Sequence, residues 1–231
     1  MPIIQDKEFG KITIRRSSKA TQVRVRVAPD GSLRASLPMH APLLLVKSLL
    51  MTSRSELRQM LSQSKPNYSF ENGMQIGKSH TLIVQNTSAK IISVSRHGRQ
   101  IIVKLPESTS LNSPDVAKKV RESMIAALRL EAKSYLPKRL AFLAEKFQYK
   151  YSKVRFSHAS GRWGSCSSNG TISLNIALMK LPFELIDYII LHELAHTKQM
   201  NHGPIFWSLV GQSDPEYKIH RHTLKTHNPS I

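Results

Sequence analysis

The sequence predicts an α+β fold, and three kinds of pattern carry this prediction. Apolar and polar residues alternate in residues 9–37 and again in 68–105, which is typical of half-buried strands. Apolar residues recur at helical spacing in residues 42–63 and again after residue 113. A further helix, at 183–196, is apolar almost all round, and a helix of that kind is buried.

Residues 9–37 predict a meander of three strands. Within residues 23–27 valines alternate with arginines, so that one face of the strand is apolar and the other is cationic. A turn at Pro29-Asp30-Gly31 leads to a third strand over residues 33–37. We interpret the arginine face as a solvated surface that discourages aggregation through strand edges, with a phosphate-binding surface as the alternative.

One helix is expected next, over residues 42–63, and Lys65-Pro66-Asn67 ends it. Strands return in residues 68–105, and Arg96-His97-Gly98-Arg99 forms a hairpin turn between two of them.

A segment rich in Ser and Thr, Pro106 to Pro114, is the best linker in the chain. We place the domain boundary there. Residues 1–110 then form a β-rich, basic N-terminal region with one helix, and residues 111–231 form a second domain. No internal repeat is evident in the sequence.

The second domain opens with a long helix. Ser113 is expected to cap it, with Pro114 at the first helical position. The apolar stripe continues to about Lys133 and on past a kink at Pro137.

Two strands follow, at 153–157 and 171–175, joined by the Gly- and Ser-rich residues 160–170. Three more helices are expected: 183–196 with Pro182 in its first turn, about 204–210, and about 214–224 with Asp214 as its cap.

The buried helix carries the sequence His192-Glu193-Leu194-Ala195-His196. Residues four apart share a helix face, so His192 and His196 can present two ring nitrogens to one ion. Glu193 lies beside a ligand without being one, which is where a general base is needed in metal-assisted hydrolysis. Buried histidines need a partner, because an unpaired buried polar group costs about 1–3 kcal/mol.

His202 is the expected third ligand. It could not share the face of His192 if the helix simply continued, and Asn201 with Gly203-Pro204 supplies turn chemistry at that point. The spacing of the three histidines equals that of the metzincin pattern, although Gln199 stands where that pattern has Gly. The alternatives for the third ligand are Glu216 and Asp214, which we rank lower.

Three protein ligands leave one position open on a tetrahedral ion, the pattern of a catalytic zinc site. We therefore expect one Zn²⁺, with added Mg²⁺ or Mn²⁺ for a nucleotide substrate. Cys166 is not expected to act as a fourth ligand or as a nucleophile, because a fourth ligand would close the site.

Several segments of the C-terminal half resemble one known family, the YgjP-like metal-dependent hydrolases, which are relatives of the SprT and WLM zincin groups. The N-terminal half is similar in layout only. The segments are Arg162-Trp163-Gly164-Ser165-Cys166-Ser167, Gly170 to Asn175, His192 to His196, Asn201-His202 and Phe206-Trp207.

This resemblance implies a zincin-like catalytic domain in residues 111–231. It implies His192, His196 and His202 as metal ligands and Glu193 as the catalytic base. Members of the family are named metallopeptidases by motif, and nucleotide hydrolysis has also been proposed within the group.

An oxyanion formed during hydrolysis needs a donor. Arg162 ranks first because it lies in a family-like segment, with a structural ion pair as its alternative role. His158, Tyr217 and His220 are the other candidates. We expect Trp163 and Trp207 to be core residues.

The formal net charge of +19 is spread along the chain and would attract polyanions. Non-specific nucleic-acid binding is one interpretation, and a charge that merely keeps the protein dispersed is the other. No apolar run reaches the roughly 18 residues of a membrane span, and no signal peptide is apparent. The single cysteine fits a reducing compartment, so we expect a cytoplasmic protein without a membrane partner.

Three functions agree with these features. The first is a zinc-dependent metallopeptidase with a peptide substrate. The second is a nucleoside triphosphate pyrophosphatase or other phosphohydrolase that uses the same metal site. The third is a nucleic-acid-associated protease of the SprT type.

Overall fold

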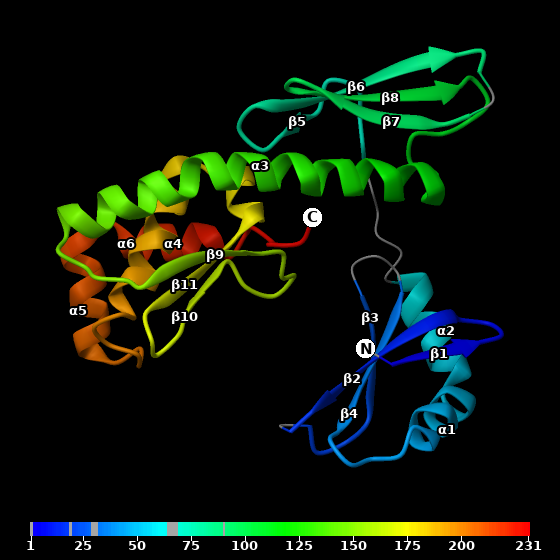
Figure 1. Cartoon of the computed structure of the whole chain (residues 1–231), viewed down its shortest axis with the longest axis horizontal. Coiled ribbons are helices and arrows are strands. Elements are labelled where there is room, and N and C mark those ends of the chain that lie inside the picture. The colour runs from blue at the N-terminus through cyan, green and yellow to red at the C-terminus, as the bar shows by residue number, and fades with distance from the viewer. Residues whose placement is uncertain (1, 19, 29–31, 64–68, 90) are drawn as a thin grey trace. The chain divides into compact units, whose positions relative to one another are not determined.

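The computed structural model describes the chain except for residues 1, 19, 29–31, 64–68 and 90. It divides into two compact units, Met1–Tyr68 and Ser69–Ile231, each of which is described by itself. Both units contain helices as well as strands, so the α+β fold class is confirmed (Figure 1).

The first unit is a four-stranded sheet with two helices on one face. Its strands stand in the order β1-β2-β4-β3. Buried residues of β1, β2 and β4 form one core with residues of the two helices, among them Val46, Leu50 and Leu57. The elements are β1 (Ile3–Asp6), β2 (Gly10–Ser17), β3 (Arg24–Val27), β4 (Leu33–Pro38), α1 (Leu44–Thr52) and α2 (Arg54–Gln63).

The strands of this unit do not form the expected meander. β4 lies between β2 and β3, parallel to β2 and antiparallel to β3. The inward residues of β4 explain its central position, since Leu33, Ala35 and Leu37 are all fully buried, whereas the valines of β3 are half-buried at an edge. The expected turn at residues 29–31 lies outside the described residues.

The helix expected over residues 42–63 is two helices that meet at Ser53. The Ser53 amide donates to the Leu49 carbonyl, and Ser53 leaves the helical conformation with φ −107° and ψ 26°. The expected end of the helix at residues 65–67 lies outside the described residues.

The second unit begins with another four-stranded sheet, in the order β5-β6-β8-β7. The hairpin turn expected at residues 96–99 is confirmed, because β7 and β8 pair antiparallel around Gly98 at φ +57°. The strands are β5 (Gln75–Ile76), β6 (His80–Thr87), β7 (Ser93–His97) and β8 (Gln100–Pro106).

The two four-stranded sheets have the same topology. In each, the first pair is antiparallel, the central pair is parallel, and the last pair is antiparallel. The registers agree as well, because Ile4 stands opposite Ile12 in the first sheet and Ile76 stands opposite His80 in the second. The chain therefore contains an internal structural repeat, which the residue pattern alone did not reveal.

The second sheet packs on a long helix, α3 (Pro114–Lys146) (Figure 1). The buried Glu131 accepts hydrogen bonds from the backbone N–H groups of Lys78, Ser79 and His80, and its Oε1 lies 2.6 Å from His80 Nδ1. This sheet belongs to the same compact unit as the segment His192 to His196, whereas the expected domain boundary near residue 110 groups it with the first sheet. Sequence patterns of strands alone do not show which helix covers them.

The helix α3 begins as expected, with Ser113 extended at the N-cap and Pro114 at the first position, and it continues as one helix through Pro137. The Ser113 side chain itself makes no capping hydrogen bond. α3 contacts the second sheet and also contacts β9 and α4.

A third sheet has the order β10-β11-β9, and the short strand β10 was not expected within residues 160–170. β9 and β11 match the two strands expected there. The remaining elements are β9 (Lys153–Ser157), β10 (Gly164–Cys166), β11 (Thr171–Asn175), the 3₁₀ helix η1 (Ile176–Lys180), α4 (Phe183–Ala195), α5 (Pro204–Ser213) and α6 (Tyr217–Leu224).

α6 begins at Tyr217 and not at Asp214. Asp214 closes α5 as its C-cap, and its carboxylate accepts from the Glu216 amide and pairs with His220 Nδ1 at 2.8 Å. Among the described residues, no helix is both long and apolar enough to cross a membrane.

Candidate metal centre

The helix α4 places the first two histidines in a buried setting. It packs on α3, α5 and α6 and on the strands β10 and β11. Its apolar residues, including Ile186, Ile190 and Leu194, are fully buried, as the all-round apolar pattern predicts. Pro182 stands at the N-cap, one position before the first turn.

The side chains of His192, His196 and His202 converge on one point. One ring nitrogen of each lies within 4.8 Å of the ligand atoms of the other two. The Nε2 atoms of His192 and His202 are 3.2 Å apart. The three ring centroids are separated by 4.7–5.1 Å.

His202 reaches this point because the chain turns after α4. The helix ends at Ala195, and the amide of Gly203 donates to the Asn201 carbonyl at 2.8 Å just before α5 begins. Phe206, in the first turn of α5, is fully buried beneath the three rings. It stacks on His196 at 4.5 Å and so supports the cluster from below.

One ring is held in a defined tautomer. His196 Nδ1 donates to the Gln199 carbonyl oxygen at 3.1 Å, which leaves its Nε2 lone pair available to a ligand. Gln199 therefore contributes its backbone at the position where the metzincin pattern has glycine. His192 Nδ1 is buried with no hydrogen-bond partner among the described residues.

The environment of His192 and His196 favours the neutral form of their rings. Burial, together with the smaller effects of His196, His202 and Arg221, lowers the pKa of His192 to about 3. Burial also lowers the pKa of His196. A neutral imidazole is the form that binds a metal ion. Three such rings around one point fit a transition-metal ion with one position open.

Glu193 lies beside this cluster in a nearly dry environment. Its side chain points toward β10, and its Oε2 atom is buried without a hydrogen-bond partner among the described residues. Burial raises the pKa of Glu193 to about 8, and the charge of Arg162 opposes that shift. A cation in the cluster would lower this pKa and favour the carboxylate.

Gly164 makes room for the Glu193 side chain. A Cβ atom at position 164 would lie 2.6 Å from Glu193 Oε1 and 2.8 Å from its Cγ. Real Cβ atoms essentially never come this close, so the strand β10 approaches α4 only because residue 164 is glycine.

We predict that Gly164→Ala displaces the Glu193 carboxylate and lowers hydrolytic activity roughly 10- to 100-fold, since a misplacement of about 1 Å costs that much. Metal content should stay unchanged, because the added Cβ would contact Glu193 and none of the three histidines. Steady-state rates and elemental analysis of purified protein measure both quantities. Gly161→Ala is the matched control, because nothing lies within 4 Å of a Cβ at that position. Equal rates in the two variants would contradict the packing argument.

The loop that carries Arg162 is fixed by one fully buried amide. Asn175 Nδ2 donates to the carbonyls of Ala159 and Arg162, at 2.6 and 2.9 Å, and its Oδ1 accepts from the Ala177 amide. The Arg162 side chain is exposed, and its charge acts on Glu193.

The other residues considered for the site have different surroundings. The charges acting on the exposed His158 come from Arg121 and Arg129 of α3. Tyr217 stacks on Trp207 at 5.5 Å. His220 pairs with Asp214, and Glu216 is exposed, so neither acidic alternative for the third ligand joins the cluster of three histidines.

Four features that shape this site were not assigned by the sequence patterns. They are the room made by Gly164, the hydrogen bonds of Asn175, the support from Phe206 and the position of Arg221. The guanidinium of Arg221 lies 4.5 Å over the ring of Trp207.

Trp163 and Trp207 are half-buried and not core residues. Cys166 is also half-buried, and burial raises its thiol pKa, which disfavours a nucleophilic role.

Comparison with known proteins places this chain in a family. A comparison with curated proteins gives no match. Two solved structures are similar over 39% of this chain: the metallopeptidase zymogens abylysin of Pyrococcus abyssi and jannalysin of Methanocaldococcus jannaschii. They are 29% and 24% identical, with TM-scores of 0.36 and 0.35, and the match covers 91% and 93% of their own chains.

The family described as "YgjP-like, metallopeptidase domain" matches residues 21–227, which is most of the chain. The chain therefore belongs to the YgjP-like metallopeptidase family and is a metal-dependent hydrolase.

Proposed function

We propose that this protein is a zinc-dependent peptidase with His192, His196 and His202 as metal ligands and Glu193 as general base. One observation carries the proposal: three imidazoles converge beside a buried carboxylate, one oxygen of which has no hydrogen-bond partner among the described residues. Zn²⁺ suits three imidazole ligands and an open fourth position better than Mg²⁺ or Mn²⁺, which prefer oxygen ligands.

A bound Zn²⁺ supplies a Lewis acid that polarises a carbonyl oxygen and lowers the pKa of a water molecule toward 7. Glu193 accepts the proton of the attacking water and later gives it to the leaving amine. Its burial keeps competing water away and holds its pKa near the working pH. Arg162 is proposed to help stabilise the oxyanion, because its charge already acts on Glu193.

The proposed substrate is a peptide in extended conformation. β10 is an edge strand of the third sheet, and it begins at Gly164, in contact with Glu193. An edge strand can pair with an extended peptide through backbone hydrogen bonds. The alternative nucleotide substrate needs several cations at the metal. Among the described residues, the cationic side chains whose charge acts on Glu193 and His192 are Arg162 and Arg221, which favours the peptide.

The proposal includes a reducing compartment such as the cytoplasm, since Cys166 is the only cysteine in the sequence.

Metal removal tests this function. We expect a strong chelator to abolish cleavage of a fluorogenic peptide library, and Zn²⁺ at one equivalent to restore it. In a comparison assay, the protein is incubated with Mg²⁺ and nucleoside triphosphates, and the release of phosphate is measured. Release of phosphate or pyrophosphate without any peptide cleavage would replace the peptidase with the phosphohydrolase.

A further inference from the structure

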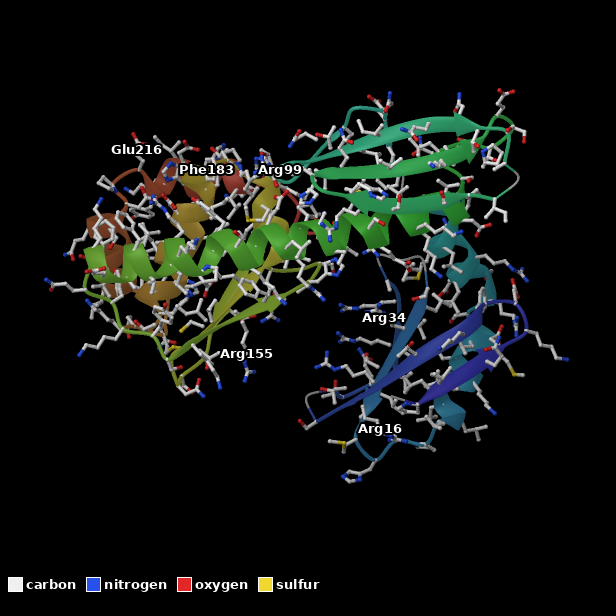
Figure 2. The ribbon with its side chains drawn as sticks, turned by 45° about the horizontal axis from the view of Figure 1, so that its top comes forward. Arg16, Arg34, Arg99, Arg155, Phe183 and Glu216 are labelled. Carbon is white, nitrogen blue, oxygen red and sulfur yellow. The ribbon has the colours of Figure 1, made fainter. Side chains whose placement is uncertain are left out.

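The outward face of the first sheet carries five cations, Lys11, Arg15, Arg24, Arg26 and Arg34, which we call the basic face. All five are exposed, and they come from the strands β2, β3 and β4. The helices α1 and α2 cover the opposite face, where the core residues lie. Figure 2 labels Arg34 on this sheet.

The strand register brings four of these side chains together in two rows across the sheet, and Lys11 lies further along β2 on the same face. In one row, Arg26 stands directly opposite Arg34, which stands beside Thr13. In the other, Arg15 and Arg24 flank Ser36. Neighbouring strands are about 4.8 Å apart and alternate residues about 7 Å apart, so the cations share a patch on the order of 10–15 Å across.

Like charges directly opposite each other, such as Arg26 and Arg34, repel in a sheet. Asp6 and Glu8 pair with Arg54 and Arg58 of α2, on the helix side of this unit. Residues 1–68 contain twelve Lys and Arg but four Asp and Glu, so the unit as a whole is strongly cationic.

The second sheet shows that the fold does not require these charges. It has the same strand order and the same registers, and its face equivalent to the basic face is nearly neutral. The equivalent positions are Arg15 and Ile83, Arg24 and Ser95, Arg26 and His97, and Arg34 and Gln100. One copy of the repeat therefore carries four arginines where the other carries none.

We infer that the basic face binds the phosphate backbone of duplex nucleic acid. A closely spaced group of arginines matches the charge of a duplex, which carries about one phosphate per 1.7 Å of its axis. Single strands are bound on aromatic side chains that stack with the bases, and the basic face carries no aromatic residue among its described positions. Contacts of this kind position the duplex without reading its sequence.

This inference is independent of the proposed peptidase activity, and the two can fail separately. Binding resides in the first unit, whereas the histidine cluster belongs to the second. Peptide cleavage in the absence of DNA should therefore be the same in the basic-face variant described next and in the unmodified protein.

The test is fluorescence anisotropy of a labelled DNA duplex of mixed sequence, titrated with the full-length protein over a range of salt concentrations. Five phosphate contacts predict a slope of log K against log salt of about −4.5. The double variant Arg24→Gln/Arg26→Gln should reduce that slope by about 2 and weaken binding roughly 10- to 100-fold near ~0.1 M salt. Its melting temperature should be nearly unchanged, since both arginine side chains are exposed.

The matched control removes two exposed cations elsewhere. Lys47→Gln lies on α1, on the helix side of the first unit, and Lys104→Gln lies on the outward face of the second sheet. This variant should bind within about threefold of the unmodified protein, because neither lysine is part of the basic face. Equal losses in both variants, or an unchanged slope in the arginine variant, would overturn the inference. Tighter binding to the single strand, or to vesicles of anionic lipid, would overturn it as well.

Discussion

Glu193→Gln is expected to lower peptide hydrolysis roughly 10²- to 10⁴-fold while the protein still takes up one metal ion. The amide has the size of the carboxylate but cannot accept the proton of the attacking water. Since burial already favours the uncharged form of Glu193, the variant should fold at least as well as the unmodified protein.

Single-turnover rates and elemental analysis of the same sample separate loss of chemistry from loss of metal. Glu184→Gln is the control, because it makes the same change in the first turn of α4 on an exposed side chain. A fully active Glu193→Gln protein would remove this residue as the general base, and the search would turn to other carboxylates.

His202→Ala is expected to weaken zinc binding by about 3 kcal/mol, one ligand's share of a typical zinc binding free energy, or roughly 10²-fold. Activity at limiting metal should fall in parallel. The side chain is exposed and lies in the turn before α5, so its loss leaves a smaller structural defect than loss of the buried His196.

Competition with a zinc-binding dye measures the affinity directly. His222→Ala, an exposed histidine of α6, is the control and should bind zinc normally. If His202→Ala also bound zinc normally while Glu216→Gln did not, the third ligand would be a carboxylate.

Local rules explain what the sequence predicted well. The α4 helix is apolar almost all round, and a helix of that kind is buried. Turn residues between His196 and Pro204 fold the chain back, and that return brings His202 to the cluster. Spacing and turn chemistry act over a few residues, so both can be read without knowing the remaining fold.

Pairing between residues far apart in the chain explains what the sequence predicted poorly. The parallel contact of β2 with β4 joins strands that are not adjacent in the chain, and alternation within a strand does not choose its neighbour. The same holds for Gly164, whose role depends on Glu193 in the distant helix α4. The hydrogen bonds of Asn175 follow from the third sheet and not from any local motif.

The repeated topology of the two sheets also bears on how the chain avoids misfolding. Two modules with equal strand order in one polypeptide could exchange strands while they form, a common failure of tandem units. Position 12 in the first sheet corresponds to position 80 in the second. Ile12 is fully buried among apolar residues, whereas His80 is buried and paired with Glu131. If β6 took the place of β2 in the first sheet, His80 would be buried among apolar residues without Glu131. If β2 took the place of β6 in the second sheet, Glu131 would be buried without His80. The pair of His80 and Glu131 therefore disfavours the exchange of strands between the two sheets.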